Sequence, residues 1–469
     1  RRATHIGSVH PTHTRAMVDT WGGYVTIRSW QRLAASIAVG ASVLLPMAAC
    51  VPPHPLVITA RPAIEAAHPD RRHAPRPAVR FYGTYWQALA DANLQAAWIV
   101  AESSEQRTLA DAIDAFLNGR NAEADSTVAT LLGARDSQVR KAARITHAAI
   151  LASEGDWPRL AAYADSADRE KRDAAGVETW APAFKDVSTS ITFADSSSEL
   201  PLTRSITGVA IIPVSVNGVK RHFWLDTGTS ITILTNSVAD AANVTGLGQD
   251  TLEMVSAVGR VSTRAAVVHS LKLGHVTVTN APAMIVGDLA LQIREANSGM
   301  PPVPIDGVIG FDVIRKLDLT IDDLDDRVII REPTLRAADD SHPRNLAWFG
   351  LPIVTLLSSH GNAIHLVLDT GAGETFGTPG MAEKSGAHWR AAERRTVQGF
   401  GGTKIEAGIA IPDVRLFLGD TPLSFKRIFL YEASYPTIFK LDGTLGADIG
   451  RGGVVRIDMT NGRLDVSGK

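Results

Sequence analysis

The sequence predicts an α+β multidomain protein in which an N-terminal α-helical, solenoid-like region precedes two duplicated all-β lobes. Three observations support this fold class. Apolar residues recur at helical spacing between residues 81 and 185, short β-runs with turns fill the chain from residue 186 onward, and this β-region repeats one motif in the same order. With 469 residues, two or three domains are expected from length alone.

The overall composition is that of an ordinary globular protein and excludes one class of function. Hydrophobic residues make up 45% and charged residues 20% of the chain, and the formal net charge is −2. Nucleic-acid binding needs a basic face or stripe, which this sequence lacks. We therefore expect no nucleic-acid partner.

Residues 1–49 have the pattern of a leader and signal peptide. Arg28 and Arg32 precede an uncharged apolar run, Leu33–Ala49, which ends directly at Cys50, the single cysteine of the chain. A basic segment, an apolar run and small residues at a cleavage point are typical of secretory signals. The run is short for a membrane-spanning helix.

The end of this run, "LLPMAAC", resembles a bacterial lipobox, with Met47 in place of the usual Leu. The resemblance implies that Cys50 is lipidated and that the protein is anchored to a membrane through its N-terminal lipid. We therefore expect a location in the bacterial cell envelope, extracytoplasmic or periplasmic. A plain secretory signal and an N-terminal anchor helix are the alternatives, and all three take the body of the protein out of the cytoplasm. Met17 is the expected translation start.

Two further regions precede the lobes. Residues 50–80 are rich in Pro, Ala and Arg and indicate an extended linker. Residues 81–185, here called the helical segment, carry apolar residues such as Leu109, Ile113 and Phe116 at helical spacing. The pattern resembles a tetratricopeptide-like or other α-solenoid, and a small helical bundle packed on the next domain fits it equally well. The helical segment is also a candidate surface for a protein partner.

The β-region is an internal duplication. In lobe 1 (residues 186–340) and lobe 2 (residues 341–469), an apolar strand leads into Asp-Thr-Gly, at Asp226 and Asp369. Each lobe later carries Asp-Gly-x-x-Gly-x-Asp, and the second glycine of that segment follows the first motif's Asp by 84 residues in lobe 1 and 77 in lobe 2. One such motif arises easily by chance, whereas two ordered pairs at similar spacing indicate duplication.

This arrangement resembles the pepsin/retropepsin family of aspartic proteases. In that family each lobe carries Asp-Thr/Ser-Gly at the end of a strand, and a later apolar-apolar-Gly segment lies beside it. Val308–Gly310 and Thr444–Gly446 match that second segment. The resemblance implies two acid-protease lobes and an aspartic endopeptidase acting on a peptide or protein substrate. It also implies Asp226 and Asp369 as catalytic residues, with no metal and no organic cofactor.

The chemistry explains why two copies of the motif are needed. Peptide hydrolysis without a covalent intermediate requires a base to activate water and an acid to protonate the substrate. Two adjacent carboxyl groups share one proton, because both cannot ionise at low cost. One lobe supplies only one carboxylate, so the lobes must pair, either within one chain or between chains.

The resemblance also implies supporting residues around the two carboxylates: Thr227, Gly228, Ser230, Thr370 and Gly371. The glycines allow the backbone to approach the opposite Asp closely. The threonine hydroxyls are expected to link the two loops beneath the site, and the hydroxyl of Ser230 to bond the carboxylate of Asp226. Lobe 2 departs from the family pattern, since Gly373 stands where Ser or Thr is usual.

Substrate cover in this family comes from a β-hairpin flap in each lobe. Residues 256–268 (flap 1) and 397–411 (flap 2) occupy that place, each with glycine at its expected tip. Gly259, Phe400 and Gly401 are the candidates for contact with substrate. Neither flap contains a tyrosine.

Each Asp-Thr-Gly is preceded by a histidine, His222 or His365, four residues before the Asp. Period-2 alternation places each histidine on the same face as its Asp, yet four residues span ~13 Å of strand, too far for contact. We interpret both histidines as surface or interlobe residues without a catalytic role.

Two other functions compete with the protease. A catalytically inactive, protease-like peptide-binding module of the cell envelope would fit the departure at Gly373, although Asp226 and Asp369 are both intact. The second alternative is a membrane-tethered scaffold that uses the helical segment for protein contacts, which would not explain the duplicated Asp motifs.

Overall fold

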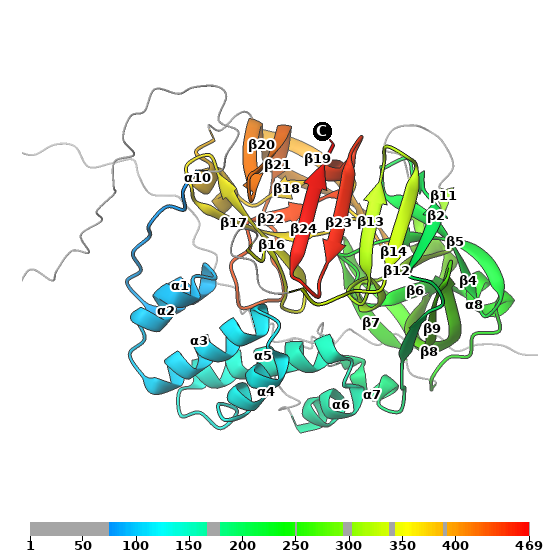
Figure 1. Ribbon diagram of the computed structural model, residues 1–469, viewed down its shortest axis with the longest axis horizontal. Coiled ribbons are helices and arrows are strands. Elements are labelled where there is room, and N and C mark those ends of the chain that lie inside the picture. Colours follow the sequence, from blue (N-terminus) through cyan, green and yellow to red (C-terminus); the bar gives the residue numbers. More distant parts are fainter. Residues whose placement is uncertain are drawn as a thin grey trace, which may run out of the picture. The chain divides into compact units, whose positions relative to one another are not determined.

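The computed structural model describes residues 75–166, 179–248, 251–293, 303–336, 343–387 and 392–468. Within them the secondary structure is mostly β, and helices are concentrated in the N-terminal part (Figure 1). The expected signal peptide and Cys50 lie outside the described residues, as does most of the expected linker. Over the part that is described, no helix has both the length and the apolar character needed to cross a membrane.

Local signals in the sequence account for where the longer helices begin and end. The Ser103 hydroxyl caps α3 by accepting from the backbone N–H of Gln106 at 3.2 Å. Asp136 caps α5 in the same way, and Gly155 ends that helix in a left-handed conformation with φ 71°. A solenoid-like arrangement of the helical segment stays a prediction. Its helices are α1 (Tyr85–Ala90), α2 (Leu94–Ile99), α3 (Ser104–Leu117), α4 (Asn121–Ala129), α5 (Ser137–Glu154), α6 (Trp157–Ser166) and α7 (Ala181–Phe184).

The main sheet of lobe 1 has the order β1-β9-β6-β12-β5-β4-β8-β7, and β3 pairs with β4. The central strands β5, β6 and β12 are apolar where they pair, as expected for strands covered on both faces. The strands of lobe 1 are β1 (Ser190–Phe193), β2 (Ser197–Pro201), β3 (Thr203–Arg204), β4 (Ala210–Val216), β5 (Val219–Leu225), β6 (Thr232–Thr235), β7 (Leu252–Ser256), β8 (Gly259–Leu273), β9 (Val276–Val286), β10 (Gln292–Ile293), β11 (Val303–Pro304), β12 (Gly307–Ile309), β13 (Asp318–Asp322) and β14 (Arg327–Arg331). Its helices are α8 (Asn236–Ala241), η3 (Asp288–Ala290) and α9 (Phe311–Ile314).

Lobe 2 repeats this plan with the order β15-β16-β17-β22-β18-β21-β20-β19. In both lobes the strand that leads to Asp-Thr-Gly pairs in parallel with the short strand of the later motif, β5 with β12 and β17 with β22. The elements are β15 (Leu346–Trp348), β16 (Pro352–Ser358), β17 (Ala363–Leu368), β18 (Phe376–Gly377), α10 (Pro379–Ser385), β19 (Ala392–Gly399), β20 (Gly402–Leu418), β21 (Thr421–Leu430), β22 (Gly443–Leu445), η4 (Ala447–Gly450), β23 (Val454–Asp458) and β24 (Arg463–Ser467).

A five-stranded sheet joins the two lobes. Its order is β2-β14-β13-β23-β24, so that strands of lobe 1 and lobe 2 pair directly, with Leu319 opposite Ile457. Figure 1 shows β13 and β14 beside β23 and β24. Arg456 in β23 forms two bonds of 2.7 Å with Asp318 in β13, a bidentate geometry favourable for an ion pair.

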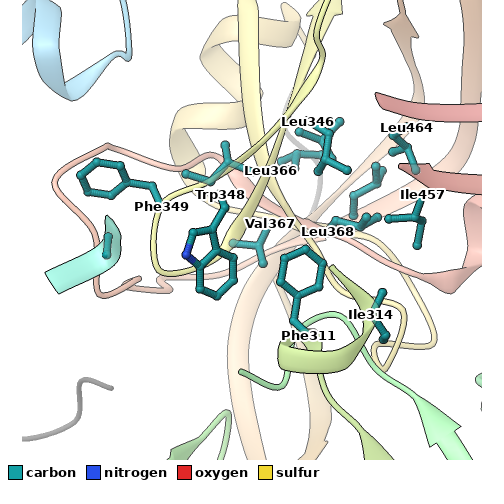
Figure 2. Close-up of a cluster of buried hydrophobic side chains, with 14 of the residues drawn as sticks. Phe311, Ile314, Leu346, Trp348, Phe349, Leu366, Val367, Leu368, Ile457 and Leu464 are labelled. Carbon is teal, nitrogen blue, oxygen red and sulfur yellow. The ribbon is translucent and has the colours of Figure 1, made fainter. Parts of the chain in front are cut away.

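An apolar core also spans the lobes (Figure 2). Phe311 of lobe 1 stacks on Trp348 of lobe 2 with ring centroids 5.1 Å apart and planes at 18°. Such a pair contributes about 0.5–1.5 kcal/mol beyond its area burial. Val367 and Leu368, at the end of β17, belong to the same core. The strand that carries Asp369 is therefore held by residues of both lobes.

The helical segment contacts both lobes. Toward lobe 2, the carbonyl of Ala90 accepts from the N–H of Lys440 at 2.7 Å. Toward lobe 1, Trp157 and Phe184 share an apolar cluster with Ile231, a few residues after Asp226. These contacts agree with the interpretation of a helical bundle packed on the next domain.

Candidate active site

The two Asp-Thr-Gly loops begin where a central strand of each lobe ends. Asp226 follows β5 and its N–H donates to the carbonyl of Ile309 at 3.1 Å. Asp369 follows β17 and its N–H donates to Leu445 at 2.9 Å. Backbone hydrogen bonding to the neighbouring strand thus continues one residue beyond the end of β5 and of β17, and it fixes the backbone position of both aspartates.

The structure brings Asp226 and Asp369 together within one chain. Each carboxyl group lies against the glycine that follows the other aspartate. A Cβ added to Gly228 would lie 2.5 Å from Cγ of Asp369, and one added to Gly371 would lie 2.3 Å from Cγ of Asp226. Real Cβ atoms do not approach other atoms this closely, so each glycine is required by the aspartate of the other lobe.

The two carboxylates have unequal hydrogen-bond partners. Asp226 Oδ1 accepts from the N–H groups of Gly228 and Thr229 at 2.8 and 3.1 Å, and its Oδ2 accepts from the Thr229 hydroxyl at 2.7 Å. Asp369 Oδ1 accepts from the N–H groups of Gly371 and Ala372 at 2.9 and 3.0 Å. Since alanine has no hydroxyl, lobe 2 cannot reproduce the bond that Thr229 makes.

This corrects the expectation for Ser230. The hydroxyl on Asp226 belongs to Thr229, three residues after the aspartate rather than four. The departure in lobe 2 accordingly lies at Ala372 and not at Gly373. Gly373 has a different constraint, because a Cβ there would lie 2.4 Å from the carbonyl oxygen of Thr207 in lobe 1.

Burial raises the pKa values of both aspartates. Desolvation raises the pKa of Asp226, while the Thr229 hydroxyl and the Asp369 carboxyl group act in the opposite direction. The pKa of Asp369 is raised well above its ordinary value by desolvation and then by the charge of Asp226. The two carboxyl groups therefore titrate as a unit rather than independently.

The two threonines link the loops in a reciprocal pattern. Thr227 Oγ1 donates to the carbonyl of Leu368 at 2.7 Å and accepts from the N–H of Thr370 at 3.0 Å. Thr370 Oγ1 donates to the carbonyl of Leu225 at 2.8 Å and accepts from the N–H of Thr227 at 3.1 Å. Both side chains are buried. These four interlobe bonds hold each aspartate in register with the other.

Sequence reasoning missed a second pair of carboxylates behind the loops. Asp312 accepts from the Thr232 hydroxyl at 3.1 Å, and Asp448 accepts from the Thr375 hydroxyl at 2.7 Å. Burial raises the pKa of Asp312 to about 6. The signal for them in the sequence is the last Asp of the repeated Asp-Gly-x-x-Gly-x-Asp segment, which is Asp312 in lobe 1 and Asp448 in lobe 2.

The first Asp of that segment explains the paired histidines. The backbone N–H of His222 donates to Asp306 at 3.0 Å, and that of His365 donates to Asp442 at 2.9 Å. The His222 side chain is exposed, whereas the His365 ring is buried and lies 3.1 Å from the carbonyl of Asp91 in the helical segment. The two histidines therefore occupy equivalent backbone positions in the two lobes, and their side chains have different surroundings.

Part of lobe 1 matches the model of a known protein family. Residues 212–313, which include Asp226, match the family model described as "Aspartyl protease". No curated protein matches the chain. Among solved structures, the chain is similar to a retropepsin-like aspartic protease from Rickettsia conorii, with 18% identity over 31% of this chain and 94% of that one and a TM-score of 0.20. It is also similar to the aspartic proteinase from Irpex lacteus, with 13% identity over 58% and 97% and a TM-score of 0.35.

Both expected flaps form hairpins. In flap 1, β7 and the start of β8 pair with Ser256 opposite Gly259, and in flap 2, β19 and β20 pair with Gly399 opposite Gly402. Gly259 and Gly401 lie at the tips with φ of 153° and 91°, a region that favours glycine. The Phe400 ring is half-buried at the tip of flap 2.

Burial, with a smaller effect from the charge of Asp369, raises the pKa values of two tyrosines outside the flaps. Burial raises the pKa of Tyr431 to about 12, and the charges of Glu406 and Asp369 act in the same direction. The Tyr435 hydroxyl lies 3.0 Å from the hydroxyl of Thr444, in the segment that pairs beside Asp369. Both follow β21, a position that no sequence motif singled out.

Proposed function

We propose that this protein is an aspartic endopeptidase that hydrolyses peptide bonds with a water activated by Asp226 and Asp369, one carboxyl group from each lobe. The single observation that carries the proposal is the close approach of the two loops, with the glycine of each lobe against the aspartate of the other. The match of residues 212–313 to the aspartyl protease family supports it.

The unequal partners assign a role to each carboxyl group. Asp226 is the base, because the Thr229 hydroxyl and two N–H groups stabilise its charged form. It takes a proton from water as the water oxygen attacks the peptide carbonyl carbon. Asp369 is the acid and gives its proton to the carbonyl oxygen. Transfer of the proton on Asp226 to the peptide nitrogen then allows the C–N bond to break.

Peptide-library cleavage between pH 4 and 7, read by mass spectrometry, tests this proposal. Asp226→Asn and Asp369→Asn should each abolish cleavage, and the double variant should be no worse than either, because the two residues act as one unit. Asp240→Asn, an exposed acid on α8, is the matched control and should cleave like wild type. Full activity of Asp369→Asn would contradict the proposal.

The alternative function is a peptide-binding module without catalysis, favoured by the absence of a hydroxyl at Ala372. In that case wild type and both Asp→Asn variants would bind the same peptides and leave them intact. Equilibrium binding measured on the library pool in parallel with cleavage separates the two functions.

We further propose that the mature protein begins at a lipidated Cys50 and is held at the bacterial cell envelope, facing away from the cytoplasm. The support is the basic segment and apolar run that end at the only cysteine of the chain. Stable anchoring takes more than one acyl chain. Mass spectrometry of the purified N-terminus should find Cys50 carrying acyl groups, and a chain that starts before residue 50 would contradict this.

A further inference from the structure

A cavity of about 380 Å³ lies at the junction of the helical segment and lobe 1. Its lining comes from the end of α5 and the start of α6, from the segment between α7 and β1, and from β9 and α9. Neither Asp226 nor Asp369 lines it. Sites for small molecules in proteins have volumes of about 300–1,000 Å³, so this cavity has room for a ligand.

The buried residues that line the cavity are all apolar: Trp157, Val278, Ala281, Pro282 and Val313. They come from the helical segment and from lobe 1, so a ligand here would contact both. On α9, Val313 lines the cavity, while Phe311 and Ile314 belong to the core shown in Figure 2. Because burial of apolar surface away from water is favourable, this lining favours a ligand with an apolar body.

Two cationic side chains that follow α9, Arg315 and Lys316, also line the cavity. The Arg315 atoms Nε and Nη1 are buried and have no hydrogen-bond partner in the described part of the chain, so Nη2 is the nitrogen that can face the cavity. Its Cζ lies 5.8 Å from the centroid of the Trp348 ring, a contact that supplies no acceptor oxygen. Burial lowers the pKa of Arg315 to about 10 and, with the charge of Arg315, also lowers the pKa of Lys316. The folded protein thus holds two neighbouring cations in surroundings that disfavour their charge.

Asp312 supplies only part of the missing negative charge. Its charge acts on both Arg315 and Lys316, and with a pKa of about 6 it is mostly ionised at pH 7. Among the other acids of the lining, Asp156 lies 3.6 Å from Arg159 in an ion pair. The remaining charged residues of the lining are exposed and therefore screened by water: Glu154, Lys185 and Asp186. Two inner cations against one inner carboxylate leave one positive charge unmatched.

We propose that this cavity is a binding site for an amphipathic monocarboxylate, whose carboxylate lies between Arg315 and Lys316 and whose apolar body lies against the apolar lining. Hydrogen bonds from cationic donors to a carboxylate are among the strong ones in proteins. A single negative charge matches the unmatched positive charge, whereas a phosphate or a dicarboxylate would exceed it. Such a carboxylate can belong to a free acid or to the C-terminal residue of a peptide. The inference does not depend on the aspartate pair or on peptide hydrolysis.

Isothermal titration of the full chain with 3-phenylpropionate tests the ligand class, in the Asp369→Asn background so that hydrolysis plays no part. The acid should bind with a Kd below about 1 mM, and the uncharged 3-phenylpropionamide at least tenfold more weakly. Acetyl-glycyl-phenylalanine carries the same groups at the end of a peptide, and the tighter binder of the two acids identifies the source of the carboxylate. Absence of saturable binding by both acids up to about 10 mM, equal affinity for the amide, or tighter binding of inorganic phosphate would overturn the proposal.

Removing one cation at a time tests the location of the site. Arg315→Met and Lys316→Met should each weaken binding of 3-phenylpropionate at least tenfold, because Asp312 then balances the cation that remains. Lys426→Met, at an exposed position of β21, is the matched control and should bind as its parent does. Without ligand, the urea midpoint of Lys316→Met should be no lower than that of its parent, because the variant removes a charge that its surroundings disfavour. Unchanged binding or a lower midpoint in Lys316→Met would overturn the site, and this variant decides the outcome even if Arg315→Met does not fold.

Discussion

Replacing Thr370 with valine should test the interlobe threonine bonds without touching a carboxylate. Valine keeps the shape of the side chain and removes the hydroxyl, which donates to Leu225 and accepts from Thr227 at 2.8 and 3.1 Å. The change leaves one carbonyl and one N–H without their partners in a buried environment. Each such group costs about 1–3 kcal/mol, so the free energy of unfolding should fall by about 2–6 kcal/mol.

Urea unfolding followed by circular dichroism gives this free energy, provided that the transition is two-state. Thr192→Val, on an exposed position of β1, is the matched control and should change stability by less than about 0.5 kcal/mol. Because the bonds are reciprocal, Thr227→Val should cost about as much as Thr370→Val. A loss in Thr370→Val no larger than that of the control would refute the reasoning.

Three further outcomes follow from the site. Gly371→Ala should abolish cleavage and lower the free energy of unfolding by about 1–3 kcal/mol, because the added Cβ would clash with the Asp226 carboxyl group. In the control Gly287→Ala, a Cβ would meet no atom within 4 Å, so neither cleavage nor stability should change. Ala372→Ser supplies a hydroxyl donor that lowers the pKa of Asp369, so the alkaline limb of the pH–rate profile should move to lower pH, and an unmoved limb would contradict this. Folding raises the pKa of Asp369 above its unfolded value, so protonation of Asp369 stabilises the folded state at low pH. This contribution to the free energy of unfolding is lost as pH rises through the folded pKa. Asp369→Asn should therefore unfold at higher urea than wild type at pH 7 and at the same urea near pH 3, and an equal midpoint at both pH values would count against the raised pKa.

The aspartate and glycine of each loop could be predicted from the sequence, whereas the hydroxyl partner of Asp226 could not. Asp-Thr-Gly at a strand end, repeated with a later Gly segment, predicts both aspartates and both glycines, because the motif and its turn are local. Which of Thr229 and Ser230 reaches the Asp226 carboxylate depends on the path of the backbone after the turn. Two adjacent hydroxyl residues look equivalent in a sequence, and the bond to Thr229 distinguishes them.

Local periodicity and turn residues were enough to predict the duplication, the aspartate and glycine of each loop and the helices between residues 85 and 166, and the family resemblance placed the two flap hairpins. Which residues meet across the lobes could be seen only in the folded molecule. The threonine bonds join residues more than 140 positions apart, and Ser256 bonds Phe400 across 144 positions. Such contacts form when two apolar lobe faces dock, and docking depends on the shapes of both surfaces together, which neither segment's own pattern of residues contains.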